Sequence, residues 1–162
     1  MGDLQFRDAT LADLPAVVGL LAGDTLGEQR EDPALPLDPG YEAAFAAIRS
    51  DPGQRLIVAV LDGRVVGTMQ LSIIPGIAFR GAWRGQIEAV RIAQALRGRG
   101  LGGELIAWAV EQFRQGGCKF VQLTSHKSRE GAHRFYERLG WMRSHDGFKL
   151  TLGPGTARAP AR

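Results

Sequence analysis

The chain has 162 residues, of which 44% are hydrophobic and 23% charged, as expected for one soluble globular domain large enough to bury a core. The single cysteine, Cys118, excludes an internal disulfide framework and a cysteine-built zinc site. The net charge is only +3, and the arginines are scattered without interleaved aromatic residues, which argues against a nucleic-acid partner.

The N-terminal half of the sequence predicts a strand, two helices and a hairpin. Thr10 followed by Asp13 is typical of the start of a helix. Two β-branched runs flank Asp62-Gly63, a pair of residues that favours a tight hairpin turn. In chain order we expect a strand at 4–7, a helix at 11–22, a loop at 23–40, a helix at 41–50 and a hairpin at 55–74.

The C-terminal half alternates strands and helices. We expect a strand at 85–92, a helix at 100–115, a strand at 119–125, a helix at 130–140 ended by Gly140, and a strand at 145–152 that closes the sheet. The core-facing positions of the longer helix are Leu101, Leu105, Trp108, Ala109 and Phe113. This order predicts one α/β domain over 1–152, with a mixed central sheet and about four helices, and a disordered tail over 153–162.

The start of the chain, MGDLQFRDAT, has no basic segment followed by an apolar run, so no secretory signal is predicted. No apolar run reaches the length of about 20 residues that a membrane span needs. We therefore expect a cytoplasmic protein with no membrane partner. The Ala-, Arg- and Gly-rich composition points to a bacterial genome.

The segment RGRGLGG, residues 97–103, lies between a predicted strand and a predicted helix. At such a junction free backbone N–H groups and the helix dipole converge on an anion, and glycines let a phosphate approach the backbone. The alternative is a flexible, solvated turn. A P-loop is excluded because Glu104 stands where Lys-Ser or Lys-Thr is needed. A dinucleotide-binding fingerprint can be matched to the glycines but lacks its strand context.

Two motifs carry a resemblance to a known family. The pattern R-x-x-G-x-G, formed by Arg97, Gly100 and Gly102, resembles the Q/R-x-x-G-x-G/A turn that cradles the coenzyme A pyrophosphate in the GNAT superfamily of acyl-CoA-dependent N-acetyltransferases. AHRFYERLGW, residues 132–141, is similar to that family's A-x-x-F-Y-x-x-x-G-F segment. The resemblance covers residues 4–152 and implies a GNAT-like fold.

The resemblance implies acetyl-CoA as cosubstrate and a primary amine as acceptor, on a small molecule or on a protein, which attacks the thioester directly. The strand before the turn would bind the pantetheine arm and the acetyl carbonyl, and the turn would bind the pyrophosphate. The cofactor-binding residues it implies are Val90, Arg91, Ile92, Arg97, Gly98, Arg99, Gly100, Leu101, Gly102 and Gly103. Many members carry Asn where this chain has Arg129, so His126, Ser128 or Arg129 itself takes that contact. No metal site is expected.

Catalytic roles are assigned to Tyr136 and Glu88. By the resemblance, Tyr136 donates a proton to the departing thiolate; the alternative is a core aromatic residue at helical spacing. Glu88 would lead water toward the amine, and its alternative is an exposed strand carboxylate. His133 is expected on a solvated helix face, and an acetyl-cysteine route through Cys118 is disfavoured.

The acidic residues of 24–38 allow a cation-attracting lid over the acceptor or a solvated loop.

The alternative function is a non-catalytic acyl-CoA-binding module that acts as a regulator or partner. The sequence leaves a homodimer open and does not name the amine.

Overall fold

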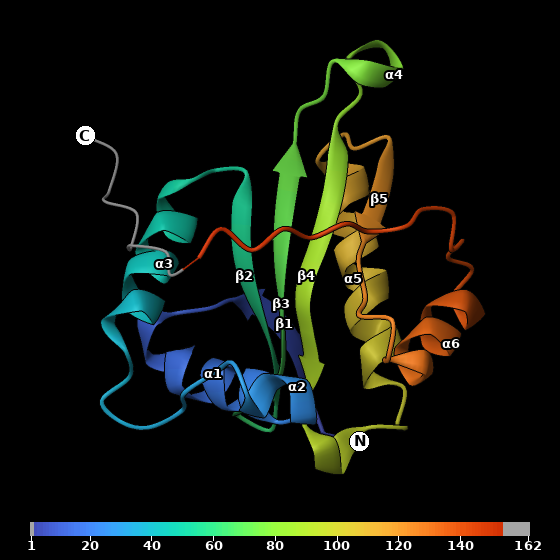
Figure 1. The fold of residues 1–162 in the computed structure, drawn as a ribbon. Coiled ribbons are helices and arrows are strands. Elements are labelled where there is room, and N and C mark those ends of the chain that lie inside the picture. The colour runs from blue at the N-terminus through green and yellow to red at the C-terminus, as the bar shows by residue number, and fades with distance from the viewer. Residues whose placement is uncertain (1, 154–162) are drawn as a thin grey trace. The chain divides into compact units, whose positions relative to one another are not determined.

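The computed structural model of the chain describes residues 2–153 (Figure 1). Its contacts divide the chain into two compact units, residues 1–122 and 123–162. Within the described residues, no helix is both long and apolar enough to cross a membrane. The tail predicted at 153–162 lies outside the described residues except for Gly153.

A mixed sheet with strand order β1-β2-β3-β4-β5 organises the first unit. The first four strands pair antiparallel. Along β4 and β5 the Lys119 N–H donates to the Trp83 carbonyl at 2.8 Å, and the Gln122 side chain donates to Gln86 at 2.8 Å, so both strands advance in the same direction. The strands are β1 Leu4–Asp8, β2 Gln54–Leu61, β3 Arg64–Ile74, β4 Arg84–Ile92 and β5 Phe120–Leu123.

The helices predicted in the first unit are all present. Three short pieces were not predicted: α2 lies inside the expected 23–40 loop, η2 lies between β4 and α5, and α4 is a turn-like segment in which Phe79 and Arg80 have φ of 55° and 63°. The helical elements are η1 Leu11–Asp13, α1 Leu14–Ala22, α2 Thr25–Glu28, α3 Pro39–Ser50, α4 Ala78–Gly81, η2 Gln94–Leu96 and α5 Leu101–Gln115.

The two faces of the sheet are covered by different helices. On one face Val58 packs with Leu14 and Val17 of α1 and with Phe45 of α3. The other face meets α5 so closely that a Cβ on Gly85 would lie 2.5 Å from the Phe113 ring, which explains a glycine inside β4.

The core-facing positions predicted for α5 are confirmed at Leu101, Leu105, Ala109 and Phe113, and Ile106 is buried as well. The prediction for Trp108 is only partly correct. Its indole is half-buried, 5.7 Å from the Phe6 ring, and lies under the guanidinium of Arg55.

The hairpin turn between β2 and β3 is the predicted Asp62-Gly63 pair. Both residues have left-handed φ, 50° and 77°, the combination that a two-residue turn of matching twist requires. The hairpin prediction is therefore confirmed in element type and in turn position.

Asp13 anchors the start of the first helical segment. Its carboxylate accepts hydrogen bonds from the Thr10 N–H and hydroxyl at 2.7 and 2.8 Å, and from both terminal nitrogens of Arg7 at 2.7 and 3.0 Å. The pKa of Asp13 is lowered from 3.8 to about 2, and the hydrogen bonds from Arg7 are the largest cause. The side chain of Asp13 is only 11% exposed and that of Arg7 is 43% exposed, so solvent screens the ion pair from the arginine side.

We expect Asp13→Asn to lower the free energy of unfolding by about 2 kcal/mol at pH 7. The folded pKa lies below the unfolded one, so the stabilisation is present above pH 3.8 and is lost as pH falls toward about 2. Urea unfolding of wild type and variant at pH 7 and pH 2.5 measures this. Asp3→Asn, at an exposed position, is the control. A stability difference that stays constant with pH would contradict the prediction.

The second unit contains α6, Glu130–Arg138. The helix ends as predicted at Gly140, which has φ of 85°. The Gly140 N–H donates to the Glu137 carbonyl at 3.0 Å and the Trp141 N–H to the Tyr136 carbonyl at 3.1 Å, a Schellman pair of hydrogen bonds.

The strand predicted at 145–152 is not formed, and these residues have no regular secondary structure. Phe148, Leu150 and Leu152 alternate as in a strand, yet all three are exposed. Alternation defines a face within a segment, whereas a strand also needs a partner ladder from elsewhere in the chain.

Candidate active site

A β-bulge interrupts the middle of β4. Thr68 of β3 pairs with Arg91, but Gln70 pairs with Glu88, so Ala89 and Val90 together face the single residue Met69. Ala89 has φ of 54°, a costly backbone conformation for a residue with a Cβ. The bulge takes backbone groups of β4 out of the regular ladder. Of the residues assigned to the acetyl and pantetheine contacts, Val90 lies in the bulge, whereas Arg91 and Ile92 pair with Thr68 and Gly67 of β3.

The glycine-rich segment leads from β4 into α5. Gly98 and Gly100 have left-handed φ of 77° and 87°, and Gly100 is the N-cap of the helix. The N–H groups of Gly103 and Glu104 both donate to the Gly100 carbonyl, at 2.8 and 3.2 Å. Leu101 and Gly102 are the first two residues of the helix. Their N–H groups come before its first backbone hydrogen bonds and point out of the helix end. A 15-residue helix thus presents its positive end beside the bulged strand.

The three arginines of this region differ in what they contact. Arg97 is exposed and its Nε donates to the Ile92 carbonyl at 3.1 Å, and Arg99 is exposed. The Arg91 side chain is only 12% exposed, donates to the Val90 carbonyl at 2.8 Å and pairs with Asp24 at 3.5 Å. The Arg91 side chain therefore joins β4 to the α1–α2 connection.

Most acidic side chains of the 24–38 loop have structural partners. Asp24 caps α2 by accepting from the Gly27 N–H at 2.8 Å, and Asp38 caps α3 by accepting from the Gly40 N–H at 2.7 Å. Glu31 accepts from the hydroxyl of Tyr41 at 3.0 Å. These contacts favour a structural role for the acids over the cation-attracting lid.

Glu88 is exposed and adjoins the bulge. Cys118 is half-buried, and burial raises the pKa of its thiol, which disfavours a reactive thiolate. Among the described residues, no group of three or more His, Cys, Asp or Glu side chains is arranged to hold a metal ion.

In the second unit, Tyr136 lies on α6 between two aromatic rings. Its ring centroid is 5.0 Å from that of Phe135 and 5.8 Å from that of Trp141. Arg129 is the N-cap of the same helix. His126 precedes it, with its Nδ1 accepting from the Ser128 N–H at 3.2 Å, and the His133 ring lies 3.1 Å from the His126 carbonyl. His133 thus has a local structural contact.

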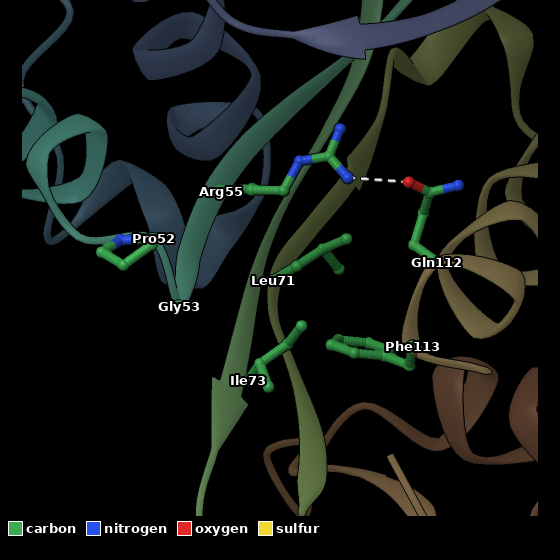
Figure 2. A pocket seen from close by; sticks show the side chains of 7 residues that line it. All are labelled: Pro52, Gly53, Arg55, Leu71, Ile73, Gln112 and Phe113. Atoms are coloured by element: carbon green, nitrogen blue, oxygen red, sulfur yellow. Dashed lines mark hydrogen bonds between the residues drawn. The ribbon is translucent and has the colours of Figure 1, made fainter. Parts of the chain in front are cut away.

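A small cavity of about 40 Å³ lies between β2, β3 and the C-terminal part of α5 (Figure 2). Arg55 crosses it to donate to the Gln112 side chain at 2.7 Å, and its other nitrogens donate to Asp8. Gln112 is eleven residues beyond Leu101, or about 16 Å along the helix. This cavity is separate from the helix start, and it has room for little more than a water molecule.

The profile of the acetyltransferase (GNAT) family matches residues 22–141, which include the bulge, the glycine-rich helix start and α6. The chain belongs to the GNAT family. As a GNAT protein it is an N-acetyltransferase, which uses acetyl-CoA to acetylate an amine. The family resemblance and the α/β fold with a mixed central sheet are confirmed, and among the described residues the sheet has five strands.

Two relatives and one solved structure each match about nine-tenths of this GNAT chain. It is 31% identical over 148 residues to an aminoalkylphosphonate N-acetyltransferase of Salmonella typhimurium, covering 91% of each chain. It is 35% identical over 147 residues to a glucosamine 6-phosphate N-acetyltransferase of Trypanosoma brucei brucei, covering 89% of this chain and 92% of the relative. A crystal structure described as a transcriptional regulator from Bacillus halodurans has a TM-score of 0.90 and 41% identity, over 93% of this chain and 100% of that one.

The bulge at Ala89 was not predicted. Alanine gives no signal for a left-handed conformation, and the mismatch in register is visible only once β3 and β4 are paired. The left-handed glycines, in contrast, follow directly from the residue type.

Proposed function

We propose that this protein binds the pyrophosphate of acetyl-CoA at the start of α5 and acetylates a small primary amine beside the β4 bulge. One structural observation carries the proposal. Within one compact unit, a bulged strand is followed by two left-handed glycines and then by a free helix N-terminus. Each feature exposes backbone donors, and donors fixed by backbone geometry suit a carbonyl and a diphosphate.

The cofactor contacts that we propose fall into three groups. Backbone groups of Val90, Arg91 and Ile92 would hold the pantetheine arm and the acetyl carbonyl. The turn would donate N–H groups to the diphosphate, and Arg97 and Arg99 would balance its charge. In the second unit, His126 and Arg129 would contact the cofactor. The turn residues are Arg97, Gly98, Arg99, Gly100, Leu101, Gly102 and Gly103.

The chemistry needs a base on the amine side and an acid on the sulfur side. An alkylamine with a pKa near 10.4 is neutral in only about one molecule in a few thousand at pH 7, so a route for its proton accelerates attack. We assign the route to Glu88, directly or through water. We assign the hydrogen bond to the departing thiolate to the hydroxyl of Tyr136, because a phenol with a pKa near 10 stays protonated at neutral pH.

The acceptor class is suggested by the names of two relatives that match about nine-tenths of the chain. Aminoalkylphosphonates and glucosamine 6-phosphate both combine an amine with a phosphorus oxyanion. We therefore propose a small amine that carries a phosphonate or phosphate as the acceptor. The proposal also includes a cytoplasmic location in a bacterium, no nucleic-acid or membrane partner, and a homodimer as the oligomer to test.

Two measurements test the proposed function. Acetyl-CoA should raise the melting temperature, because a ligand that binds only the native state stabilises it. A panel of amines assayed for CoA release should then include phosphonate- and phosphate-bearing compounds among the best acceptors. No thermal shift with acetyl-CoA would contradict the cofactor assignment.

A non-catalytic acyl-CoA-binding module is the second candidate. It is favoured by one observation: the 41%-identical structure from Bacillus halodurans is described as a transcriptional regulator. This candidate predicts a thermal shift with acetyl-CoA but no CoA release with any amine of the panel, so the same pair of measurements separates the two functions.

A further inference from the structure

The sheet face opposite α5 carries a row of polar side chains beside the bulge. Gly85 of β4 faces α5, where it meets Phe113, and Ile87 is buried on the same side. Strand alternation therefore puts Arg84, Gln86 and Glu88 on the opposite face.

Neighbouring strands extend this row. Ser72 of β3 pairs with Gln86, and Gln70 pairs with Glu88. The Ser72 hydroxyl and the Gln70 amide both donate to the Gln54 side chain of β2, at 2.7 and 3.1 Å. On the other side Gln122 of β5 donates to Gln86 at 2.8 Å. These five residues, called here the amide floor, are Gln54, Gln70, Ser72, Gln86 and Gln122.

The two charged residues of the row lie at its ends along β4. Glu88 adjoins the bulge, where the acetyl group is proposed to bind, and Arg84 begins the strand. Four residues of extended strand separate their Cα atoms by about 13 Å. An elongated acceptor can thus place its amine at the bulge and its remaining groups over the amide floor toward Arg84.

Arg84 has no partner within the protein as described. Its side chain is partly buried, and its Nε is fully buried without a hydrogen bond from any described residue. No described carboxylate forms an ion pair with it, in contrast to Arg7 with Asp13 and Arg55 with Asp8. A buried guanidinium nitrogen without a partner is costly, and an oxyanion is the group that satisfies it best.

A sheet face that helices cover only in part is often polar, and that property alone would explain the glutamines, which are at least partly exposed, but Ser72 is buried. It does not explain a partly buried arginine beside them whose Nε is fully buried without a hydrogen bond from any described residue. Uncharged amides next to it also leave its charge available to a ligand, whereas a carboxylate in the floor would neutralise it.

We propose that Arg84 binds an oxyanion of the acceptor, that Glu88 receives its ammonium end, and that the amide floor hydrogen-bonds the polar groups between them. This inference rests on the proposed acetyl transfer and deepens it by assigning a residue that selects anionic amines. Phosphonate, sulfonate and carboxylate share the required chemistry, and the phosphonate is favoured because it alone of the three can carry two negative charges near neutral pH.

The test compares acceptors that differ only in the anion: 3-aminopropylphosphonate, 3-aminopropanesulfonate, 4-aminobutyrate and propylamine. We expect wild-type kcat/KM to be about tenfold to a hundredfold higher for the phosphonate than for propylamine. In Arg84→Gln that ratio should fall by at least about tenfold, mainly through KM, with the acetyl-CoA thermal shift preserved. Arg64→Gln, which removes an exposed arginine at the hairpin, should keep the wild-type ratio.

A second measurement does not depend on a variant. Propylphosphonate, which has the anion but no amine, should inhibit the wild-type enzyme competitively against 3-aminopropylphosphonate. Three results would overturn the inference while leaving acetyl transfer intact. Propylphosphonate does not inhibit, or the wild-type enzyme has equal kcat/KM with all four amines. In the third, folded Arg84→Gln keeps the wild-type ratio of kcat/KM for the phosphonate over kcat/KM for propylamine. If the enzyme binds acetyl-CoA but acetylates neither the four amines nor any amine of the wider panel, both the proposed function and the inference about Arg84 are rejected.

Discussion

Gly102→Asp is expected to lower the affinity for acetyl-CoA by at least about 100-fold while leaving the free protein folded and at least as stable as the wild type. The two effects have opposite signs for one physical reason. The carboxylate lies in the first turn of α5, where the positive helix end stabilises a negative charge by about 0.3–1 kcal/mol. The same carboxylate occupies the place of the proposed diphosphate and repels it.

Gly102 is a better test position than Gly100. Gly100 has φ of 87°, so any other residue there adds backbone strain that would confuse the result. Gly102 lies inside the helix, where replacing glycine with another residue does not oppose the backbone conformation.

The matched control is Gly102→Asn, which has nearly the same shape as the aspartate without its charge. Calorimetric titration with acetyl-CoA and melting curves of the free proteins give both quantities. The charge explanation requires the Asp variant to bind much more weakly than the Asn variant. Affinities within about threefold of each other would mean that the diphosphate does not lie at this helix end.

Tyr136→Phe is expected to reduce kcat by about 10²- to 10⁴-fold, the range of a positioned proton donor. Phenylalanine keeps the aromatic ring that contacts Phe135 and Trp141, so the melting temperature should change little. Acetyl-CoA binding should persist, because the diphosphate contacts are proposed at the start of α5. The measurement is CoA release with the best amine of the panel, together with melting curves.

Tyr41, the only other tyrosine of the chain, supplies the control. Its hydroxyl donates to Glu31 at 3.0 Å and accepts from the Asp32 N–H at 3.1 Å, and burial is the largest cause that raises its pKa. Tyr41→Phe should therefore cost about 1 kcal/mol of stability and leave kcat within about twofold. If Tyr136→Phe instead behaves like Tyr41→Phe, losing stability but not kcat, Tyr136 is a core aromatic residue and not the acid.

Local signals in the sequence were sufficient for the hairpin, the start of α5 and the end of α6. In each case a glycine adopts a left-handed conformation, at Gly63, Gly100 and Gly140, where residue type restricts the backbone directly. The family motifs contain two of these three positions, which is why the fold and the family were predictable from short segments.

The segment 145–152 shows the limit of this reasoning. Its alternating apolar residues predict a strand, yet strand formation depends on a partner that the segment does not contain. Trp108 shows the same limit. Helical spacing places it near the core, but the burial of its side chain depends on Phe6 and Arg55, which lie on strands elsewhere in the chain.

By itself, the sequence determined the family, the glycine-opened helix start proposed for the diphosphate, and Tyr136 as the candidate acid, because these depend on a few adjacent residues. Only the tertiary structure decided the bulge at Ala89, the ion pair of Asp24 with Arg91, and the unpaired Arg84 beside the amide floor. Strand register and the burial of a charge arise from contacts between residues far apart in the chain. Local residue preferences therefore do not predict them.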